Sequence, residues 1–156
     1  MKLLITFSIV KNYKMKNLNQ VQKYLNKIPN INEGGCGISA LTLYRWIKEN
    51  AEIGNTKFVF LYREDSEDRY FNNQKVLKDS EGEADAPSHA CLLYEGKFID
   101  SDGDLDISNF EWVQIIDEED FVKRSLENVE DWNYHFDRGY IREIELEVNI
   151  SLEDIK

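Results

Sequence analysis

The chain has 156 residues, of which 42% are hydrophobic and 12% aromatic, and its net charge is −11. Length and apolar content are typical of a globular protein, so we expect one domain with a sizeable core over residues 1–156. The acidic balance repels phosphate backbones, and the sequence has no Lys/Arg stripe with interleaved aromatics, which argues against nucleic acid as a partner.

The first segment, MKLLITFSIVK at 1–11, contains a charged residue and then a mostly apolar run. It has no small-residue cleavage pattern, so we interpret it as an N-terminal strand or packing segment and not as a signal peptide. No stretch approaches the ~20 apolar residues that a membrane span needs. Two cysteines, Cys36 and Cys91, are too few for a disulfide framework. These features predict a cytoplasmic protein with no membrane partner.

Two helices are predicted next. The first ends at Pro29, and its apolar residues at helical spacing are Leu18, Val21, Leu25 and Ile28. The second runs from Gly37 to about residue 52, before Gly54. It is apolar on most of its faces, which is typical of a central helix packed on more than one side.

The middle of the chain begins with a strand. The run KFVFLYR at 57–63 is β-branched and aromatic, which predicts a buried strand. A charged excursion follows, with a short helix predicted around residues 69–77. Charge, glycine and proline then cluster at 79–87 and predict a surface loop.

Four further strands and one helix complete the prediction. SHACLLY at 88–94 and KFIDS at 97–101 flank Glu95-Gly96, a dipeptide that favours a two-residue hairpin turn. EWVQIID at 111–117 has the pattern of another strand.

The C-terminal part begins at Asp117, which is a candidate cap for a helix running to about residue 129. The tail GYIREIELEVNI at 139–150 alternates apolar and charged residues, so we expect a half-exposed strand. Helices come first and an antiparallel sheet follows, which indicates an α+β fold.

The segment INEGGCGISALTLYRWIKEN at 31–50 places Cys36 between glycines at the start of the second helix. A thiol there faces unpaired backbone N–H groups and the positive end of the helix dipole, which favour a thiolate. The dipole contributes only about 0.3 to 1 kcal/mol. An imidazolium about 4 Å away would contribute on the order of 4 kcal/mol. Cys36 therefore needs a histidine beside it to react, and without one it is a small residue in a helix-capping loop.

The predicted hairpin supplies a histidine with carboxylates nearby. Counting back from the turn, the pairs are Tyr94 with Lys97, Leu93 with Phe98, Leu92 with Ile99, Cys91 with Asp100 and His89 with Asp102. On the face that carries His89, Asp100 is then a diagonal neighbour and Asp102 lies directly opposite. A carboxylate beside the ring fixes the tautomer of a catalytic imidazole and favours its charged form.

The segments GGCGISALTLYRWIK and SHACLLYEGKFIDSDG together resemble the papain-like cysteine peptidase superfamily, which includes peptidases, amidases, transglutaminases and deamidases. The resemblance implies N-terminal helices that place the nucleophile at the start of a central helix packed on an antiparallel sheet. It implies that Cys36 attacks a carbonyl, that His89 transfers the proton and that Asp100 orients His89. Asn32 and Gly37 are then the candidates for holding the oxyanion.

Rival sites use other residues. DSDGDLDISNFE at 100–111 resembles a calcium loop, but Leu105 stands where the sixth position requires glycine. His135 is an alternative base, although the hairpin favours His89. The cysteines and histidines lack zinc-ligand spacing, and Cys91 is expected only to pack. We therefore expect no metal and no cofactor.

The sequence thus predicts a cysteine-dependent hydrolase or acyltransferase. It would act on an amide or isopeptide bond of a peptide or protein substrate through a Cys-His-Asp triad and a thioester intermediate. The alternative is a catalytically inactive papain-like module that serves as a protein-binding domain.

Overall fold

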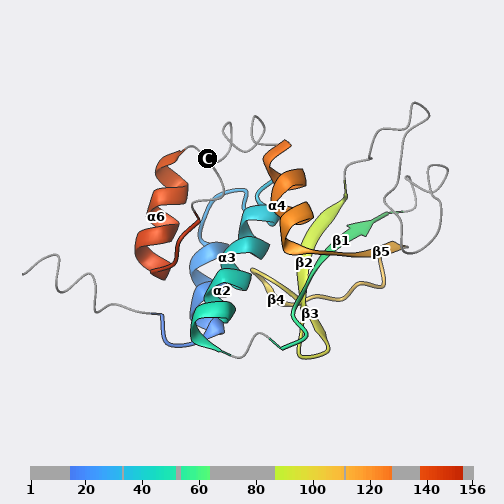
Figure 1. Cartoon of the computed structure of the whole chain (residues 1–156), viewed down its shortest axis with the longest axis horizontal. Helices are drawn as coiled ribbons and strands as arrows, with labels where there is room; N and C mark the ends of the chain where they lie inside the picture. The colour runs from blue at the N-terminus through green and yellow to red at the C-terminus, as the bar shows by residue number, and fades with distance from the viewer. Residues whose placement is uncertain are drawn as a thin grey trace, which may run out of the picture.

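The computed structural model describes residues 15–32, 34–51, 54–63, 87–110, 112–127 and 138–152. This part of the chain forms helices and an antiparallel sheet, as expected for an α+β fold (Figure 1). Its elements, in chain order, are α2 (Leu18–Asn26), α3 (Cys36–Asn50), β1 (Lys57–Tyr62), β2 (His89–Tyr94), β3 (Lys97–Asp100), β4 (Gly103–Asp104), β5 (Trp112–Ile116), α4 (Glu118–Glu127) and α6 (Arg138–Val148).

The sheet has the strand order β4-β3-β2-β1-β5, and all neighbouring strands are antiparallel. The apolar run KFVFLYR forms β1, which lies between β2 and β5 and is buried at every position after Lys57. This confirms the prediction of a buried strand. The strands predicted at 88–94, 97–101 and 111–117 are also confirmed, with bounds that differ by one or two residues.

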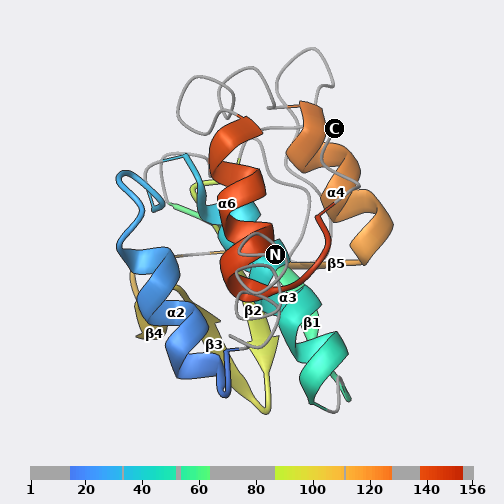
Figure 2. The same cartoon turned by 90° about the vertical axis from the view of Figure 1, so that its left-hand side faces the viewer.

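The helices cover one face of the sheet. Phe58, Phe60 and Leu92 point from β1 and β2 into the main core that α2, α3 and α6 share. Residues at the alternating positions, including Val59 and Leu61, point to the opposite face, where loop residues after β4 cover them. Figures 1 and 2 show α2, α3 and α6 gathered on the same side of the sheet.

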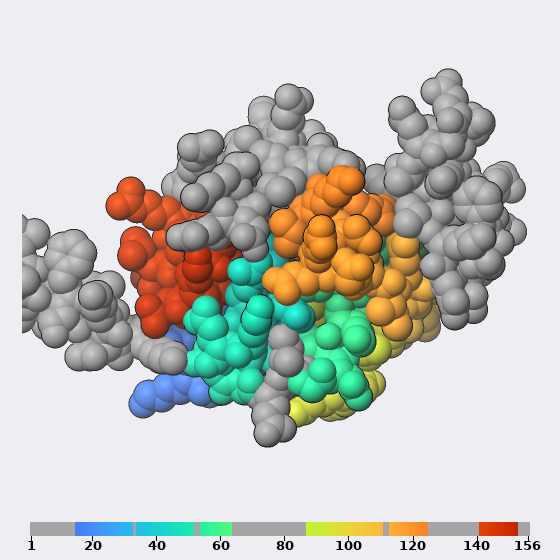
Figure 3. All heavy atoms as spheres, viewed as in Figure 1, coloured from blue at the N-terminus to red at the C-terminus, as the bar shows by residue number. Residues whose placement is uncertain are grey.

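Helix α3 lies at the centre of this layer. Nine of its residues are buried, and they lie on all sides of the helix, as its apolar composition predicts. It packs against β2 and β3 of the sheet and against α2 and α4. In the view of Figure 3, α3 lies beside both α4 and α6. The helix is therefore held by contacts with both the sheet and the neighbouring helices.

Side-chain caps stabilise the N-terminal ends of two helices, α2 and α4. The Oδ1 atom of Asn17 accepts a hydrogen bond from the backbone N–H of Gln20 at 2.9 Å, at the start of α2. The Oδ1 atom of Asp117 accepts one from the N–H of Asp120 at 2.8 Å. Because Asp117 immediately precedes α4, the predicted capping role of this residue is confirmed.

The predicted strand at 139–150 is wrong, because this segment forms α6. Ile144 and Val148 are fully buried and Ile141 is half-buried, which is helical spacing on one face. Leu146, which a strand would place on the same face as Ile144, is 58% exposed. The apolar residues fit both periods, and packing against the helical layer decides in favour of the helix. Asn149, with a φ of 58°, then ends it.

The hairpin turn forms as predicted. Glu95 and Gly96 have φ angles of 49° and 77°, the left-handed values of a two-residue hairpin turn. The three pairs nearest this turn have the predicted register. The pairing then stops at Leu92 and Ile99, because the chain turns through residues 101–102 into β4. The prediction that Asp102 lies opposite His89 is therefore wrong.

Several predictions lie outside the described residues. They are the N-terminal segment at 1–11, the short helix at 69–77, nearly all of the loop at 79–87 and the rival base His135. Among the described helices, none has the length and apolar content that a bilayer span requires.

Candidate active site

Cys36 is the first residue of α3. Gly34 has a φ of 124°, a backbone conformation that favours glycine, and Gly35 occupies the N-cap position without a side-chain cap. The first hydrogen bond at this end of the helix runs from the N–H of Ser39 to the carbonyl of Gly35 at 3.0 Å. The amides from Cys36 onward in the first turn therefore have no acceptor within the helix. The half-buried thiol of Cys36 belongs to this first turn.

His89 is the first residue of β2 and pairs with Leu61 of β1. Its side chain is only 11% exposed, and its Nε2 atom lies 3.0 Å from Oδ2 of Asp100. The ring stacks on Phe110 with 6.2 Å between centroids and 21° between planes. Strand pairing, the carboxylate and the aromatic ring together fix the orientation of the imidazole.

Cys36 and Asp100 both act on the charge of His89. Burial lowers the pKa of His89, because a low-dielectric site disfavours the charged imidazole. Hydrogen bonds with Asp100 and with Cys36, and the attraction to both, outweigh burial and raise the pKa to about 9. Since Asp100 engages Nε2, the Nδ1 atom is the one left for the Cys36 thiol. His89 is therefore charged at neutral pH and connects the other two side chains.

Asp100 ends β3, and its side chain is 7% exposed. One carboxylate oxygen, Oδ2, faces His89, and the other, Oδ1, accepts a hydrogen bond from the backbone N–H of Asp102 at 2.8 Å. Its backbone carbonyl accepts a hydrogen bond from Nε2 of Gln22 in α2, also at 2.8 Å. Hydrogen bonds from Asp102 and Gln22 thus hold the side chain and the backbone of Asp100, respectively.

The structure brings together the three residues that the sequence predicts as a triad. The start of α3, the start of β2 and the end of β3 meet, so that the thiol, the imidazole and the carboxylate follow one another in that order. Such a row can supply a sulfur nucleophile, a group that accepts and returns its proton, and an anion that stabilises the charged ring.

The two residues expected to hold an oxyanion occupy different settings. Gly37 is buried in the first turn of α3, where its N–H is one of the amides without a helical acceptor. Asn32 is exposed, and its side chain contacts the turn after β3. Its Oδ1 accepts from the hydroxyl of Ser101 at 3.0 Å, and its Nδ2 donates to Oδ2 of Asp102 at 3.3 Å. The oxyanion role of Asn32 stays a prediction. Its two hydrogen bonds are with Ser101 and Asp102, the residues that follow Asp100.

Gln22 is a site residue that the sequence analysis missed. It is a buried polar residue in α2, and its amide reaches the backbone of Asp100. The signal was its position four residues after Leu18 and three before Leu25, which places it on the apolar stripe of the helix. A polar residue on such a stripe must find a partner inside the protein.

Phe110 is the second residue that the sequence analysis missed. It covers one side of His89, and the guanidinium carbon of Arg63 lies 5.6 Å from the centre of the Phe110 ring. The sequence could not reveal this contact, because it depends on how the loop after β4 folds over the sheet.

Cys91 packs on the face of the sheet away from the helical layer, where it is fully buried beside Val59 and Leu61. Burial is the largest of the causes that raise the pKa of this thiol to about 12, followed by the nearby charges of Asp100 and Cys36. The predicted packing of Cys91 is confirmed, and a thiol in this state is a poor nucleophile.

The acidic residues of the 100–111 segment engage separate partners. Asp100 holds His89, Asp104 lies 3.3 Å from the Lys97 ammonium, and Oδ1 of Asp106 accepts from the N–H of Ser108. Within the described residues, no three side chains of His, Cys, Asp or Glu gather as a metal site would require.

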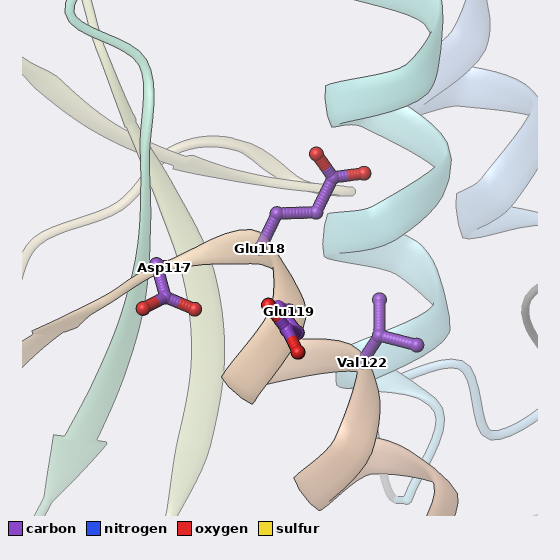
Figure 4. Close-up of a pocket in the computed structure, with 4 residues that line it drawn as sticks. All are labelled: Asp117, Glu118, Glu119 and Val122. Atoms are coloured by element: carbon purple, nitrogen blue, oxygen red, sulfur yellow. The ribbon is translucent and has the colours of Figure 1, made fainter.

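An open hollow lies at the start of α4, away from the triad (Figure 4). It measures about 530 Å³ and is lined by Asp117, Glu118, Glu119 and Val122. Glu118 points toward α3 and pairs with Arg45 at 3.1 Å. Arg45 is nine residues beyond Cys36, or roughly 13 Å along the helix at 1.5 Å per residue. The hollow is therefore separate from the reactive thiol.

Comparison of the chain with protein-family models, with curated protein sequences and with solved structures gave no significant match. The functional argument therefore depends on the geometry of the site.

Proposed function

We propose that the protein is a papain-like cysteine-dependent hydrolase or acyltransferase that acts on an amide or isopeptide bond of a peptide or protein substrate. The observation that carries the proposal is the row of Cys36, His89 and Asp100, in which a buried imidazole lies 3.0 Å from a carboxylate and is near enough to a helix-start thiol for that thiol to raise its pKa. The chain order of these groups, and their setting on a central helix and an antiparallel sheet, support the papain-like fold.

The first half of the reaction forms a thioester. The Cys36 thiolate attacks the carbonyl carbon of the substrate, and the electron pair of the C=O bond moves to oxygen. When the tetrahedral intermediate collapses, the carbon–nitrogen bond breaks and the imidazolium of His89 gives its proton to the leaving amine. Asp100 keeps the ring oriented through Nε2, so that Nδ1 stays directed at the reacting atoms.

The second half releases the acyl group. His89, now neutral, takes a proton from water or from an acceptor amine, and the resulting nucleophile attacks the thioester carbonyl. The carbon–sulfur bond breaks, Cys36 leaves as the thiolate, and the imidazolium is restored. Water yields a carboxylic acid, and an amine yields a new amide.

The amides of Cys36 and Gly37 are the proposed oxyanion donors. They lie in the first turn of α3 beside the sulfur, and neither has an acceptor within the helix. Removing a single donor of this kind typically slows catalysis about 10²–10³-fold. Gly37 lacks a Cβ, which leaves room for the substrate backbone to approach.

The alternative function is a catalytically inactive papain-like module that binds a protein partner. The structure favours the enzyme because the side chains of His89 and Asp100 are 11% and 7% exposed, and taking charged groups out of water is costly. A binding surface does not require a buried, hydrogen-bonded imidazolium next to a thiol.

The experiment is incubation with a peptide library that contains free amine acceptors, followed by mass spectrometry. Hydrolysis, deamidation and transamidation each change peptide masses, so one measurement covers the three reactions. We expect products with the wild type and with Cys91→Ala, and none with Cys36→Ala or His89→Gln. The same masses before and after incubation with the wild type, together with equal peptide retention by wild type and Cys36→Ala, would instead establish the binding module.

A further inference from the structure

The carboxylate of the triad lies at a weakly paired place in the sheet. The ladder between β2 and β3 ends at Leu92 and Ile99, one residue before Asp100. Beyond Asp100 the chain turns at once into β4, which has only two residues. Strand pairing with β2 therefore does not fix Asp100, although its Oδ2 must stay near 3.0 Å from His89 for the hydrogen bond to persist.

Side chains from the N-terminal helical region provide the missing support. Gln22 donates to the carbonyl of Asp100 at 2.8 Å. Asn32 accepts from Ser101 at 3.0 Å and donates to the carboxylate of Asp102 at 3.3 Å. These four residues, Gln22, Asn32, Ser101 and Asp102, are called the turn clamp below.

The turn clamp reaches the carboxylate itself through Asp102. The backbone N–H of Asp102 donates to Oδ1 of Asp100 at 2.8 Å, while Oδ2 of Asp100 faces His89. A change in the path of residues 101–102 therefore rotates or shifts the carboxylate. A drift of about 1 Å would move Oδ2 beyond hydrogen-bonding distance of the imidazole.

We propose that Asn32 is a positioning residue that acts through Ser101 and Asp102 to hold the carboxylate of Asp100 on His89. The proposal rests on the proposed function, because it concerns the same triad. It replaces the oxyanion role as the main contribution of Asn32. Both polar atoms of the Asn32 amide contact the turn, so the side chain is directed at the support of the triad.

The two possible roles of Asn32 predict different results when its partner Ser101 is mutated. Ser101 is 2% exposed, so its hydroxyl has no access to a substrate carbonyl. If Asn32 held the oxyanion, Asn32→Ala would impair turnover and Ser101→Ala would not. If Asn32 positions the turn, both variants impair turnover, because both remove the hydrogen bond between Asn32 and Ser101; Asn32→Ala also removes the bond to Asp102.

The test is an NMR titration of the imidazole of His89 in the wild type, Asn32→Ala and Ser101→Ala. The described titratable groups that contact this ring are Asp100 from β3 and Cys36 from α3. The chain has two histidines, and His135→Gln identifies their signals. Asn19→Ala, an exposed asparagine on α2, is the matched control.

We expect the midpoint of the His89 titration to fall by about one pH unit in both variants, which is a tenfold change in its proton affinity, and to stay unchanged in Asn19→Ala. Alkylation of Cys36 should slow in parallel. An unchanged His89 midpoint in Asn32→Ala and Ser101→Ala overturns the proposal, as does loss of turnover in Asn32→Ala alone. The titration needs no substrate. A wild type that gives no products would therefore refute the proposed function, while the His89 midpoints in the variants would still decide whether Asn32 positions Asp100.

Discussion

Replacing Asp100 by Asn should lower the pKa of His89. The amide is nearly the same size as the carboxylate, but it has no negative charge and only one oxygen acceptor. In the wild type, burial lowers the pKa, and the contacts with Asp100 and Cys36 outweigh it and raise the value from 6.5 to about 9. At 1.36 kcal/mol per unit, this difference is about 3 kcal/mol in favour of the charged ring. Without Asp100, burial is opposed by Cys36 alone.

The sign of the effect on stability follows from the raised pKa. Because the value in the folded state lies above that of the unfolded chain, protonated His89 stabilises the fold fully below about pH 6.5. This contribution fades as the pH rises and is lost above about pH 9. The wild type should therefore have a higher free energy of unfolding than Asp100→Asn. The difference should be largest near pH 6.5 and should shrink as the pH approaches 9.

Two assays check the prediction. NMR titration of the His89 ring should show a midpoint in Asp100→Asn at least one unit below the wild type, or about 1.4 kcal/mol. Urea unfolding of both proteins between pH 6 and 10 should show the narrowing difference in stability. A ring that titrates at the same pH in both proteins would refute the reasoning, because the Asp100 contact would then contribute nothing to the charge on His89.

Three further predictions concern packing and reactivity. Cys91, whose pKa burial raises to about 12, should resist iodoacetamide at neutral pH until the protein unfolds, as peptide mapping can show; labelling of the folded protein would contradict this. Ile144→Ala should lower the free energy of unfolding by about 2–5 kcal/mol and Leu146→Ala by much less, because the first side chain is fully buried and the second is 58% exposed; equal losses in urea unfolding would favour a strand. Asp117→Ala should cost about 1 kcal/mol through the lost cap, and Asp117→Asn little; equal effects would argue against capping.

The sequence was informative where local rules decide the structure. Glu95-Gly96 selects a two-residue turn, and the turn fixes the register that brings His89 and Asp100 to neighbouring strands. The glycines before Cys36 and the apolar run after it likewise locate the start of α3. Each of these features depends on a few residues that are adjacent in the chain.

The sequence failed where packing decides. Ile144, Leu146 and Val148 fit a two-residue period, whereas Ile141, Ile144 and Val148 fit a helix, and only contact with the core distinguishes them. The contacts of Asn32 could not be predicted either, since its partners lie about 70 residues later in the chain. Long-range contacts of this kind can be identified only once the fold is known.

The most direct test of the triad measures how the rate of Cys36 alkylation by iodoacetamide depends on pH. The proteins are the wild type, His89→Ala and His89→Gln, and the modified cysteine is located by peptide mass. Glutamine keeps a donor for Asp100 and cannot carry the charge, so it controls for loss of folding in the alanine variant. At a reference pKa of about 8.5, an unassisted thiol is only about 3% ionised at pH 7.

If Cys36 is paired with His89, the wild type should react at pH 7 at least about tenfold faster than either variant, because the imidazolium holds the thiol as thiolate. Both variants should show the steep rise with pH of an ordinary thiol. Equal rates and the same pH dependence in all three proteins would contradict the account, since Cys36 would then gain nothing from the histidine beside it.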